Sequence, residues 1–348
     1  MKYPLLLLPF LATAALGAQP PPGGVDGLSQ DDVSKAVSAL KQTFVRPSAL
    51  SAADLARDTL QGLLDRLSPE VALVSGSSES ATAIPFYSED YNGTGYLRIG
   101  AMTAEIVTKA GEVLKAWSSG KIGAVILDLR GAGLSGDFDA ASALEVYFCA
   151  KGSELYRFDY GAAGTHGGDT VSAPADPLFT GVLIVLVDES TAEAAETIAA
   201  SLQECAKALI LGSTTAGRPF KYQDVRLNGA VLRMAVAEVL LPDGKKLGVN
   251  GLKPDISVAP GSASRAQLVQ SVSTHGVASV IQERDRPHLN EAALVSGSNP
   301  DVDELEQEQN GTVPAPPLID RQLEQALDLI TSISIYKSKG APMSHGVE

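Results

Sequence analysis

Cysteine and histidine are both scarce in this chain of 348 residues. The two cysteines, Cys149 and Cys205, lack the CxxC spacing of redox and zinc sites, and the four histidines are far apart in the sequence. Because a bound metal needs several such side chains close together, there is no positive signal for a metal site, and we expect no cofactor. The cysteines could form one disulfide or stay as two buried thiols, and the sequence leaves both alternatives open.

Positive charge is also in deficit. The chain has 27 lysine and arginine residues against 41 aspartate and glutamate residues, so its formal net charge is −14. A nucleic-acid-binding surface needs clustered basic residues, and this balance therefore argues against a nucleic-acid partner.

Long apolar runs are missing except near the N-terminus. There, Lys2 precedes the apolar run Leu5–Leu16, and the small residues Gly17 and Ala18 follow it. The run is too short to span a bilayer comfortably and has the layout of a secretory signal peptide; a retained membrane anchor is the alternative. We expect residues 1–18 to be cleaved, leaving an exported protein, periplasmic or extracellular, with no stable membrane anchor.

The sequence after this leader is first helical and then alternates between strands and helices. Residues 28–75 form a predicted N-terminal helical segment, with apolar residues at helical spacing in 33–44 and 55–67. Residues 92–260 form a predicted α/β core with a largely parallel sheet. Its predicted strands are Tyr96–Ile99, Ile122–Leu127, Val182–Val187, Ala208–Leu211 and Val231–Leu241, and its predicted helices include Thr103–Trp117 and Phe138–Ala150.

Two regions are expected to be less regular. Residues 161–178 are rich in Gly, Ala, Asp and Pro and are predicted to form a mobile loop. Residues 261–348 form a predicted C-terminal extension, partly disordered, with a helix near 318–333.

The stretch Asp188–Arg218 is the most informative part of the core. It follows an apolar strand and opens a helix, with Ser190 in the position of a cap and Glu193 at capping-box spacing from it. The start of a helix presents backbone N–H groups and a positive dipole end, which suit anions and oxyanions. The sequence therefore indicates a place suited to chemistry.

Several segments around this stretch recur in order in one known family. They are Leu63–Pro69, Gly95–Ile99, Ile126–Gly131, Val187–Ala192, Leu211–Arg218, and Leu241–Gly244 with Gly251–Asp255. In this order and spacing, residues 28–258 resemble the carboxyl-terminal processing proteases, or tail-specific proteases, a family of serine endopeptidases. The resemblance implies a crotonase-like β-α spiral core of the ClpP/crotonase type. The family's PDZ domain has no counterpart, because only residues 70–92 separate the N-terminal helices from the core.

The resemblance also implies which residues stand at the family's catalytic positions. Its serine nucleophile lies in Thr-Ala-Ser-Ala-Ser-Glu, and its lysine base lies in Thr-Phe-Gly-Lys. Here these segments read TAEAAE and TAGR, so Glu193 and Arg218 occupy the serine and lysine positions. The family's supporting positions are matched by Glu196, Asp128, Arg130 and Gly131.

Other positions depart from the family pattern. The Asn-Pro-Gly-Gly that follows the Asp-x-Arg pair has become Ala132–Ser135. The glutamine four residues after the lysine is replaced by Tyr222, with Gln223 one place further on.

These replacements remove the groups that serine-type acyl transfer needs. A carboxylate is a poor nucleophile towards an amide, and the guanidinium of Arg218 stays protonated and cannot act as a general base. We therefore expect Glu193 and Arg218 to form an ion pair, with the capping box from Ser190 as the alternative role of Glu193.

Two further sets of side chains are candidates for surrogate chemistry. Ser190 and Lys221 are possible surrogates for the nucleophile and the base, although a helix cap and a solvated lysine are their ordinary roles. Glu193 and Glu196 lie on one helix face and could form an acid/base pair. The sequence thus predicts a pseudoprotease that binds peptide or protein partners. The alternative is an active serine-type endopeptidase with rearranged catalytic residues.

Overall fold

The computed structural model of the chain describes residues 27–44, 50–75, 84–120, 122–132, 137–161, 168–282 and 318–340. Residues 1–18, the predicted signal peptide, lie outside the described residues. So does most of 132–135, the segment in which this chain departs from the family pattern. The chain divides into two compact units, residues 1–66 and 67–348.

The first unit contains two helices, as the apolar spacing predicts. Helix α1 (Gln30–Thr43) starts at Ser29, whose side chain forms a capping box with Asp32. Helix α2 (Ala52–Leu67) starts after Ser51, whose hydroxyl accepts a hydrogen bond from the Asp54 N–H at 3.1 Å. Neither helix contains a buried residue.

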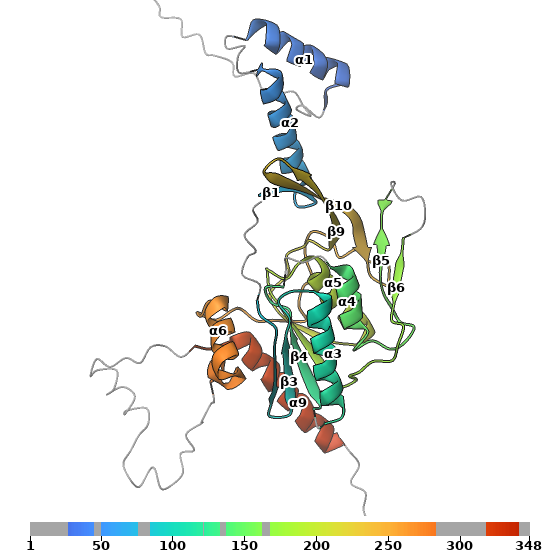
Figure 1. The fold of residues 1–348 in the computed structure, drawn as a ribbon, viewed down its shortest axis with the longest axis vertical. Helices are drawn as coiled ribbons and strands as arrows, with labels where there is room; N and C mark the ends of the chain where they lie inside the picture. Colours follow the sequence, from blue (N-terminus) through green and yellow to red (C-terminus); the bar gives the residue numbers. More distant parts are fainter. Residues whose placement is uncertain are drawn as a thin grey trace, which may run out of the picture. The chain divides into compact units, whose positions relative to one another are not determined.

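A six-stranded sheet forms the centre of the second unit, in the order β11-β8-β7-β4-β3-β2. Its strands β3 and β4 are labelled in Figure 1. All its neighbours are parallel except β2 and β3. The strands are β2 (Tyr87–Tyr91), β3 (Thr94–Arg98), β4 (Ala124–Asp128), β7 (Val182–Val187), β8 (Leu209–Gly212) and β11 (Ile256–Ser257).

Helices cover both faces of this sheet. Alternate residues of β4, such as Val125 and Ile126, enter two different apolar cores, because successive side chains of a strand point to opposite faces. One core contains α3 (Ala104–Ser118), α4 (Phe138–Glu145) and α5 (Glu193–Cys205), and the other contains α6 (Arg265–His275), the 3₁₀ helix η4 (Val277–Val280) and α9 (Arg321–Gly340). The second unit is therefore a mixed α/β fold.

A second sheet is antiparallel and is only partly predicted. Its long central strand, β10 (Ala230–Leu240), corresponds to the predicted strand at 231–241. The strands β1 (Val71–Ser75), β5 (Glu154–Asp159), β6 (Thr170–Ser172) and β9 (Phe220–Leu227) were not predicted from the sequence. The prediction of a loop over 161–178 is wrong at β6, which pairs with β5.

Two helix boundaries also differ from the sequence prediction. The helix predicted over 138–150 ends at Glu145, and the residues after it form turns. The C-terminal helix predicted near 318–333 is α9, which extends to Gly340.

The sequence left open whether the two cysteines are bonded to each other. They form the disulfide Cys149–Cys205, which joins the turn after α4 to the end of α5. None of the helices in the described ranges is both long and apolar enough to cross a membrane.

Candidate functional site

Helix α5 begins at Glu193, in a backbone conformation that L-amino acids rarely adopt. The φ angle of Glu193 is +54°, and the cap residue Ala192 makes no side-chain hydrogen bond. Ser190 is exposed, and its N–H donates to Asp188 Oδ1 at 3.0 Å. The predicted capping box from Ser190 to Glu193 is therefore wrong. Left-handed backbone at a non-glycine residue costs about 1–3 kcal/mol and is concentrated at functional sites.

The Glu193 carboxylate is bound by an arginine that the sequence did not single out. Arg233 Nη1 lies 3.2 Å from Glu193 Oε1, and the Glu193 side chain is only 5% exposed. Arg233 also binds Asp224, with its Nε 3.0 Å from Oδ1, and its guanidinium lies 5.7 Å from the centre of the Tyr222 ring. Strands β9 and β10 supply these three residues, and their register places Asp224 opposite Arg233.

The expected ion pair between Glu193 and Arg218 is wrong. In the part of the chain that the structure describes, the ion pair of Glu193 is with Arg233, and Arg218 contributes through its backbone. The Glu193 N–H donates to the Arg218 carbonyl at 3.1 Å. The two residues are thus adjacent through their backbones, but their side chains do not bind each other.

The electrostatic surroundings of Glu193 and Tyr222 reflect their burial. Burial raises the pKa of Glu193 above its ordinary value, and the guanidiniums of Arg233 and Arg218 offset only part of this effect. Burial, with a contribution from the charge of Glu193, raises the pKa of Tyr222 to about 12. The phenol is therefore neutral at physiological pH.

Glu196 holds the turn that carries Arg218. Its carboxylate accepts hydrogen bonds from the Thr215 hydroxyl at 2.5 Å, the Gly217 N–H at 3.1 Å and the Arg218 N–H at 2.9 Å. Burial raises the pKa of Glu196, and these hydrogen bonds to the charged form partly oppose the rise. Both oxygens of Glu196 are occupied, so the candidate acid/base pair with Glu193 gains no support from the geometry.

Asp128 and Arg130 form a buried ionic network. Arg130 binds Asp128 through Nη2 at 2.7 Å and Asp320 through Nη1 at 2.8 Å, and Arg265 binds Asp128 at 2.9 Å. Burial alone would raise the pKa of Asp128, but Arg130 and Arg265 outweigh burial and hold that pKa well below its usual range. This network joins β4 to the start of α9, so these two residues have a structural role.

Gly131 has its backbone N–H already occupied. The N–H donates to Asp188 Oδ1 at 3.0 Å, and the φ angle of Gly131 is +75°. Asp188 thereby fixes Gly131, which follows β4, to the segment before α5. The Gly131 N–H is not free to stabilise an oxyanion in this arrangement.

The two proposed surrogates do not come together. Lys221 Nζ lies 4.8 Å from the centre of the Phe158 ring. The next residues on the same strand, Tyr222 and Asp224, instead contact the Arg233 side chain. Because side chains alternate along a strand, Lys221 points to the other face of β9. The exposed Ser190 donates its backbone N–H to Asp188, and its hydroxyl makes no hydrogen bond to the residues described here.

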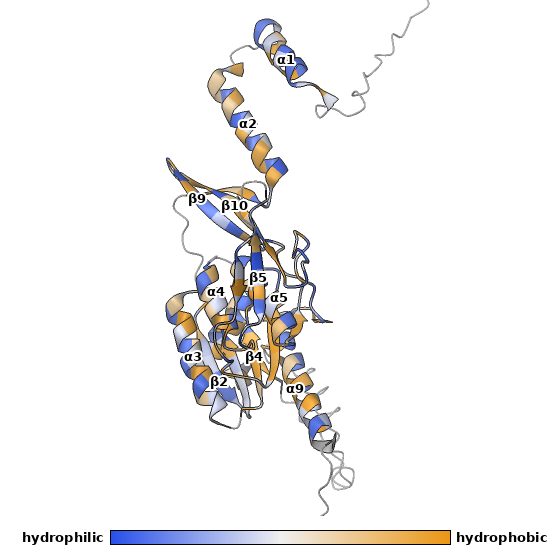
Figure 2. Ribbon diagram, turned by 90° about the vertical axis from the view of Figure 1, so that its right-hand side faces the viewer, coloured by the Kyte–Doolittle hydropathy of each residue, from blue (hydrophilic) through white to orange (hydrophobic). Residues whose placement is uncertain are grey.

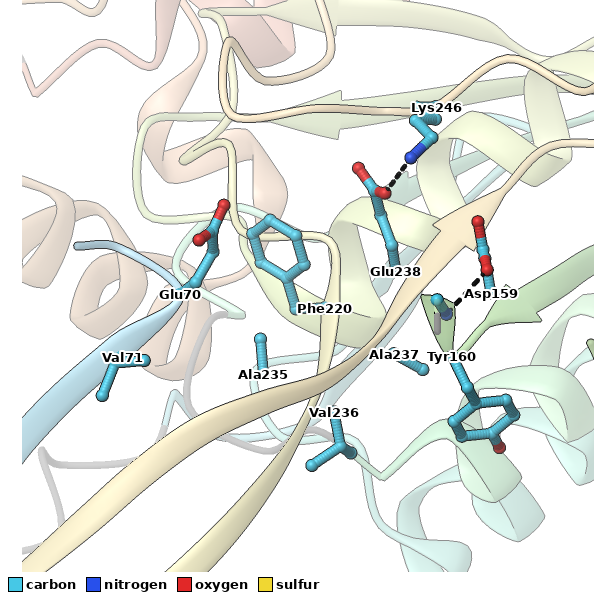
Figure 3. Close-up of a pocket in the computed structure, with 11 residues that line it drawn as sticks. Glu70, Val71, Asp159, Tyr160, Phe220, Ala235, Val236, Ala237, Glu238 and Lys246 are labelled. Atoms are coloured by element: carbon cyan, nitrogen blue, oxygen red, sulfur yellow. Dashed lines mark hydrogen bonds and ion pairs between the residues drawn. The ribbon is translucent and has the colours of Figure 1, made fainter. Parts of the chain in front are cut away.

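A surface pocket of about 360 Å³ lies in the antiparallel sheet (Figure 3). It lies beside the part of β10 between its pairing with β1 and its pairing with β5. The pairing of β10 with β9 shifts register at the same place, between Ala235 and Ala237. Phe220 lines it, and Lys246 and Glu238 form an ion pair beside it. Neither Glu193 nor Arg233 lines this pocket. Across the described ranges, no three His, Cys, Asp or Glu side chains are grouped as a metal site requires.

Comparison with known proteins identifies relatives of this chain. Residues 93–258 match the model described as Peptidase family S41. The carboxy-terminal processing protease CtpA of Bacillus subtilis is 30% identical over 136 residues, which cover 38% of this chain and 28% of that protein. The chloroplastic C-terminal processing peptidase of Tetradesmus obliquus is 26% identical over 243 residues, which cover 68% of this chain and 50% of that protein.

The chain spans half or less of the length of these two relatives. A solved structure of a candidate peptidase from Parabacteroides merdae is similar in fold, with a TM-score of 0.51 and 15% identity over 68% of this chain and 84% of that chain. The family match and the named relatives confirm the resemblance seen in the sequence motifs. Residues 93–258 are therefore a peptidase family S41 domain, and the chain is similar to the carboxyl-terminal processing proteases.

Proposed function

We propose that this protein is an exported, tail-specific-protease-like pseudoprotease, which binds peptide or protein partners without cleaving them. The observation that carries the proposal is the ion pair of Glu193 with Arg233 at the position of the family serine. A family nucleophile needs a free hydroxyl at this point, and here a buried carboxylate is bound to a guanidinium instead.

The rest of the site supports the same conclusion. The lysine position holds Arg218, and a guanidinium cannot accept the proton of a nucleophile. The surrogate residues are engaged elsewhere or exposed, because Lys221 lies against the Phe158 ring and Ser190 is on the surface. What remains is the inherited scaffold, including the left-handed backbone at Glu193 and the turn held by Glu196.

Peptide or protein partners are proposed on the grounds of family membership. The relatives are named as processing proteases and peptidases, which act on polypeptides. Loss of the reacting groups removes the chemical step but does not by itself remove binding, because binding and chemistry depend on different contacts.

The proposal also covers the cellular location of the protein and the fold type of its core. The disulfide Cys149–Cys205 is consistent with an oxidising, periplasmic or extracellular space, as is the predicted leader at residues 1–18. For the core we retain a crotonase-like β-α spiral as the proposed fold type.

The test uses the purified chain and a disordered polypeptide such as casein. We expect labelled casein to bind in a fluorescence anisotropy titration and to remain intact on gels after prolonged incubation. Cleavage that disappears in Glu193→Ala, Ser190→Ala or Lys221→Ala would overturn the loss of activity and favour the serine-type endopeptidase. Absence of both binding and cleavage would overturn the proposed partner class.

A reversion experiment tests whether the scaffold is inherited. We expect Glu193→Ser with Arg218→Lys to gain little activity, because Arg233 would remain beside position 193 with Asp224 as its ion-pair partner. Adding Arg233→Ala is expected to raise the cleavage rate above that of the double variant. Equal rates in the double and triple variants would show that Arg233 does not obstruct the site.

A further inference from the structure

The contact between α4 and α5 is joined covalently at one point and leaves polar atoms without partners beside that point. The two helices lie side by side in both views of the fold (Figure 1, Figure 2). The covalent link is the disulfide between Cys149, in the turn after α4, and Cys205, the last residue of α5. The Cys149 N–H donates to the Glu145 carbonyl at 3.0 Å, so the end of α4 lies directly beside the disulfide.

The polar atoms without partners belong to Glu145 and Ser201. Both side chains are fully buried, and Ser201 faces the Glu145 carboxyl from α5, four residues before Cys205. Within the part of the chain that the structure describes, neither carboxyl oxygen of Glu145 and no hydroxyl atom of Ser201 has a hydrogen-bond partner. A buried polar group without a partner costs free energy, because in water it would be hydrogen-bonded. This part of the contact therefore favours separation of the two helices, and the disulfide opposes it.

One sulfur of the disulfide is more accessible than the other. Cys149 is fully buried, whereas Cys205 is partly exposed. Cys205 also lines a pocket of about 180 Å³ together with Phe148, Phe179 and Leu183, and Cys149 does not line it. None of the described residues that line this pocket is acidic, so the pocket does not repel a thiolate. Because thiol–disulfide exchange depends on access to the sulfur that is attacked, exchange should begin at Cys205.

We propose that Cys205 is the site at which a dithiol reductant attacks, and that reduction of the disulfide releases α4 from α5. A thiolate of the reductant bonds to Cys205 Sγ, and the bond to Cys149 breaks with its electron pair leaving on Cys149 Sγ, which takes up a proton. The second thiolate of the reductant attacks the reductant's own sulfur in the mixed disulfide and releases Cys205, which is protonated in turn. Overall, the dithiol loses two electrons and two protons and becomes a disulfide, and the two cysteines gain them.

Release of the helices follows from what remains after reduction. Without the covalent link, separation of α4 from α5 lets water satisfy the Glu145 carboxyl and the Ser201 hydroxyl. Proteins open locally in this way without unfolding as a whole. Helix α5 starts at Glu193, so the disulfide holds the far end of the helix that carries the candidate site. The inference does not rest on the proposed function, because no residue of the Glu193 site takes part in the exchange.

Mass mapping of a mixed disulfide tests which sulfur is attacked. The full chain, produced with its own leader in an exporting host, is treated briefly with 2-mercaptoethanol, then alkylated with N-ethylmaleimide and digested with trypsin. We expect mercaptoethanol on Cys205 with maleimide on Cys149 at least about tenfold more often than the reverse. The chain denatured in urea is the matched control and should give both products in similar amounts. Similar amounts from the folded chain would overturn attack at Cys205.

Hydrogen exchange read by mass spectrometry tests the release of α4. We expect the amides of α4 and of the second half of α5 to exchange at least about tenfold faster in dithiothreitol, with β7 and α9 unchanged. Unchanged exchange in α4 and α5 would overturn the release. An equal rise throughout residues 67–348 would also overturn it, because that is the result of global unfolding. These measurements need no substitution, so they do not depend on whether a variant folds.

The variant Glu145→Leu tests the contribution of the carboxyl group. Leucine places apolar atoms where the carboxyl has no partner, which favours the closed contact. In dithiothreitol we expect the α4 amides of this variant to exchange at least about threefold more slowly than those of the unmodified chain. The matched control Glu112→Leu, at an exposed position of α3, should behave like the unmodified chain. Equal exchange in Glu145→Leu and the unmodified chain would overturn the role of Glu145 in the release.

Discussion

The Glu193 carboxylate accepts a hydrogen bond from Arg233 Nη1 at 3.2 Å, across 40 residues of sequence. The same guanidinium binds Asp224 on the neighbouring strand, so one arginine joins the start of α5 to the hairpin of β9 and β10. Glu193, which the sequence resemblance aligns with the family's serine, therefore forms a structural contact between two elements.

Replacement of Arg233 should destabilise the protein. In Arg233→Ala the buried carboxylate of Glu193 loses its partner, and a buried group left without one costs about 1–3 kcal/mol. We expect the free energy of unfolding, measured by urea denaturation, to fall by about this amount.

Two variants make this prediction specific to the ion pair. Arg226→Ala, at an exposed position of β9, should change stability by less than about 0.5 kcal/mol. Adding Glu193→Gln to Arg233→Ala should recover part of the loss, because no unpaired charge then remains. An equal loss in Arg226→Ala and Arg233→Ala would contradict a specific role for the pair.

Glu196 should be essential for the turn at residues 215–218. In Glu196→Ala, the Thr215 hydroxyl and the N–H groups of Gly217 and Arg218 lose their acceptor. We expect a loss of about 2–4 kcal/mol in urea denaturation, since several buried donors become unsatisfied together. Glu196→Gln, which keeps one carbonyl acceptor, should lose less. Equal stability in all three proteins would contradict the anchoring role.

Glu145 should make stability depend on pH. It lies fully buried on α4, and neither carboxyl oxygen has a hydrogen-bond partner in the structure. Burial raises the pKa of Glu145 well above its ordinary value of 4.5, and Ser201 on α5 offsets only part of the rise. The folded state thus keeps the proton to a higher pH than the unfolded state does. Stability from this group is complete below about pH 4.5 and is lost as pH rises, by up to about 1.4 kcal/mol per pH unit.

The variant Glu145→Gln removes this dependence. Glu193 and Glu196 have raised pKa values of the same sign, so the unmodified chain and the variant must be compared at each pH. We expect the variant to be more stable by about 1 kcal/mol or more at pH 8, and to gain less at pH 5. Parallel stability curves between pH 5 and 8 would show that Glu145 does not titrate as inferred.

The disulfide should contribute measurably to stability. It joins the turn after α4 to the last residue of α5 across a sequence separation of 56 residues. We expect the double variant Cys149→Ser with Cys205→Ser to melt roughly 5–15 °C lower, from a loss of about 2–4 kcal/mol. Dithiothreitol should lower the melting temperature of the unmodified chain to that of the variant. Two free thiols in the unreduced, denatured chain would refute the bond.

The sequence by itself predicted four of the six strands of the central sheet, β3, β4, β7 and β8, but not β2 or β11. Apolar runs such as Val182–Val187 and the Ala-rich stretch of α5 are local patterns, and they predict a buried strand and the helix that follows it. The antiparallel sheet was mostly missed because its strands lack such a pattern. Most of β9 is exposed, and β6 has only three residues.

The motifs likewise indicated the family resemblance, and they predict Glu193 and Arg218 at the catalytic positions, because both inferences depend only on the order and spacing of residues. Only the tertiary structure decided which arginine binds the glutamate. The motif spacing predicts that Arg218 lies near Glu193, and their backbones are hydrogen-bonded in the structure. The spacing does not determine where either side chain points. Cross-strand pairing aligns Arg233 with Asp224 and aims it at the start of α5, and that alignment depends on a hairpin register that no local pattern specifies.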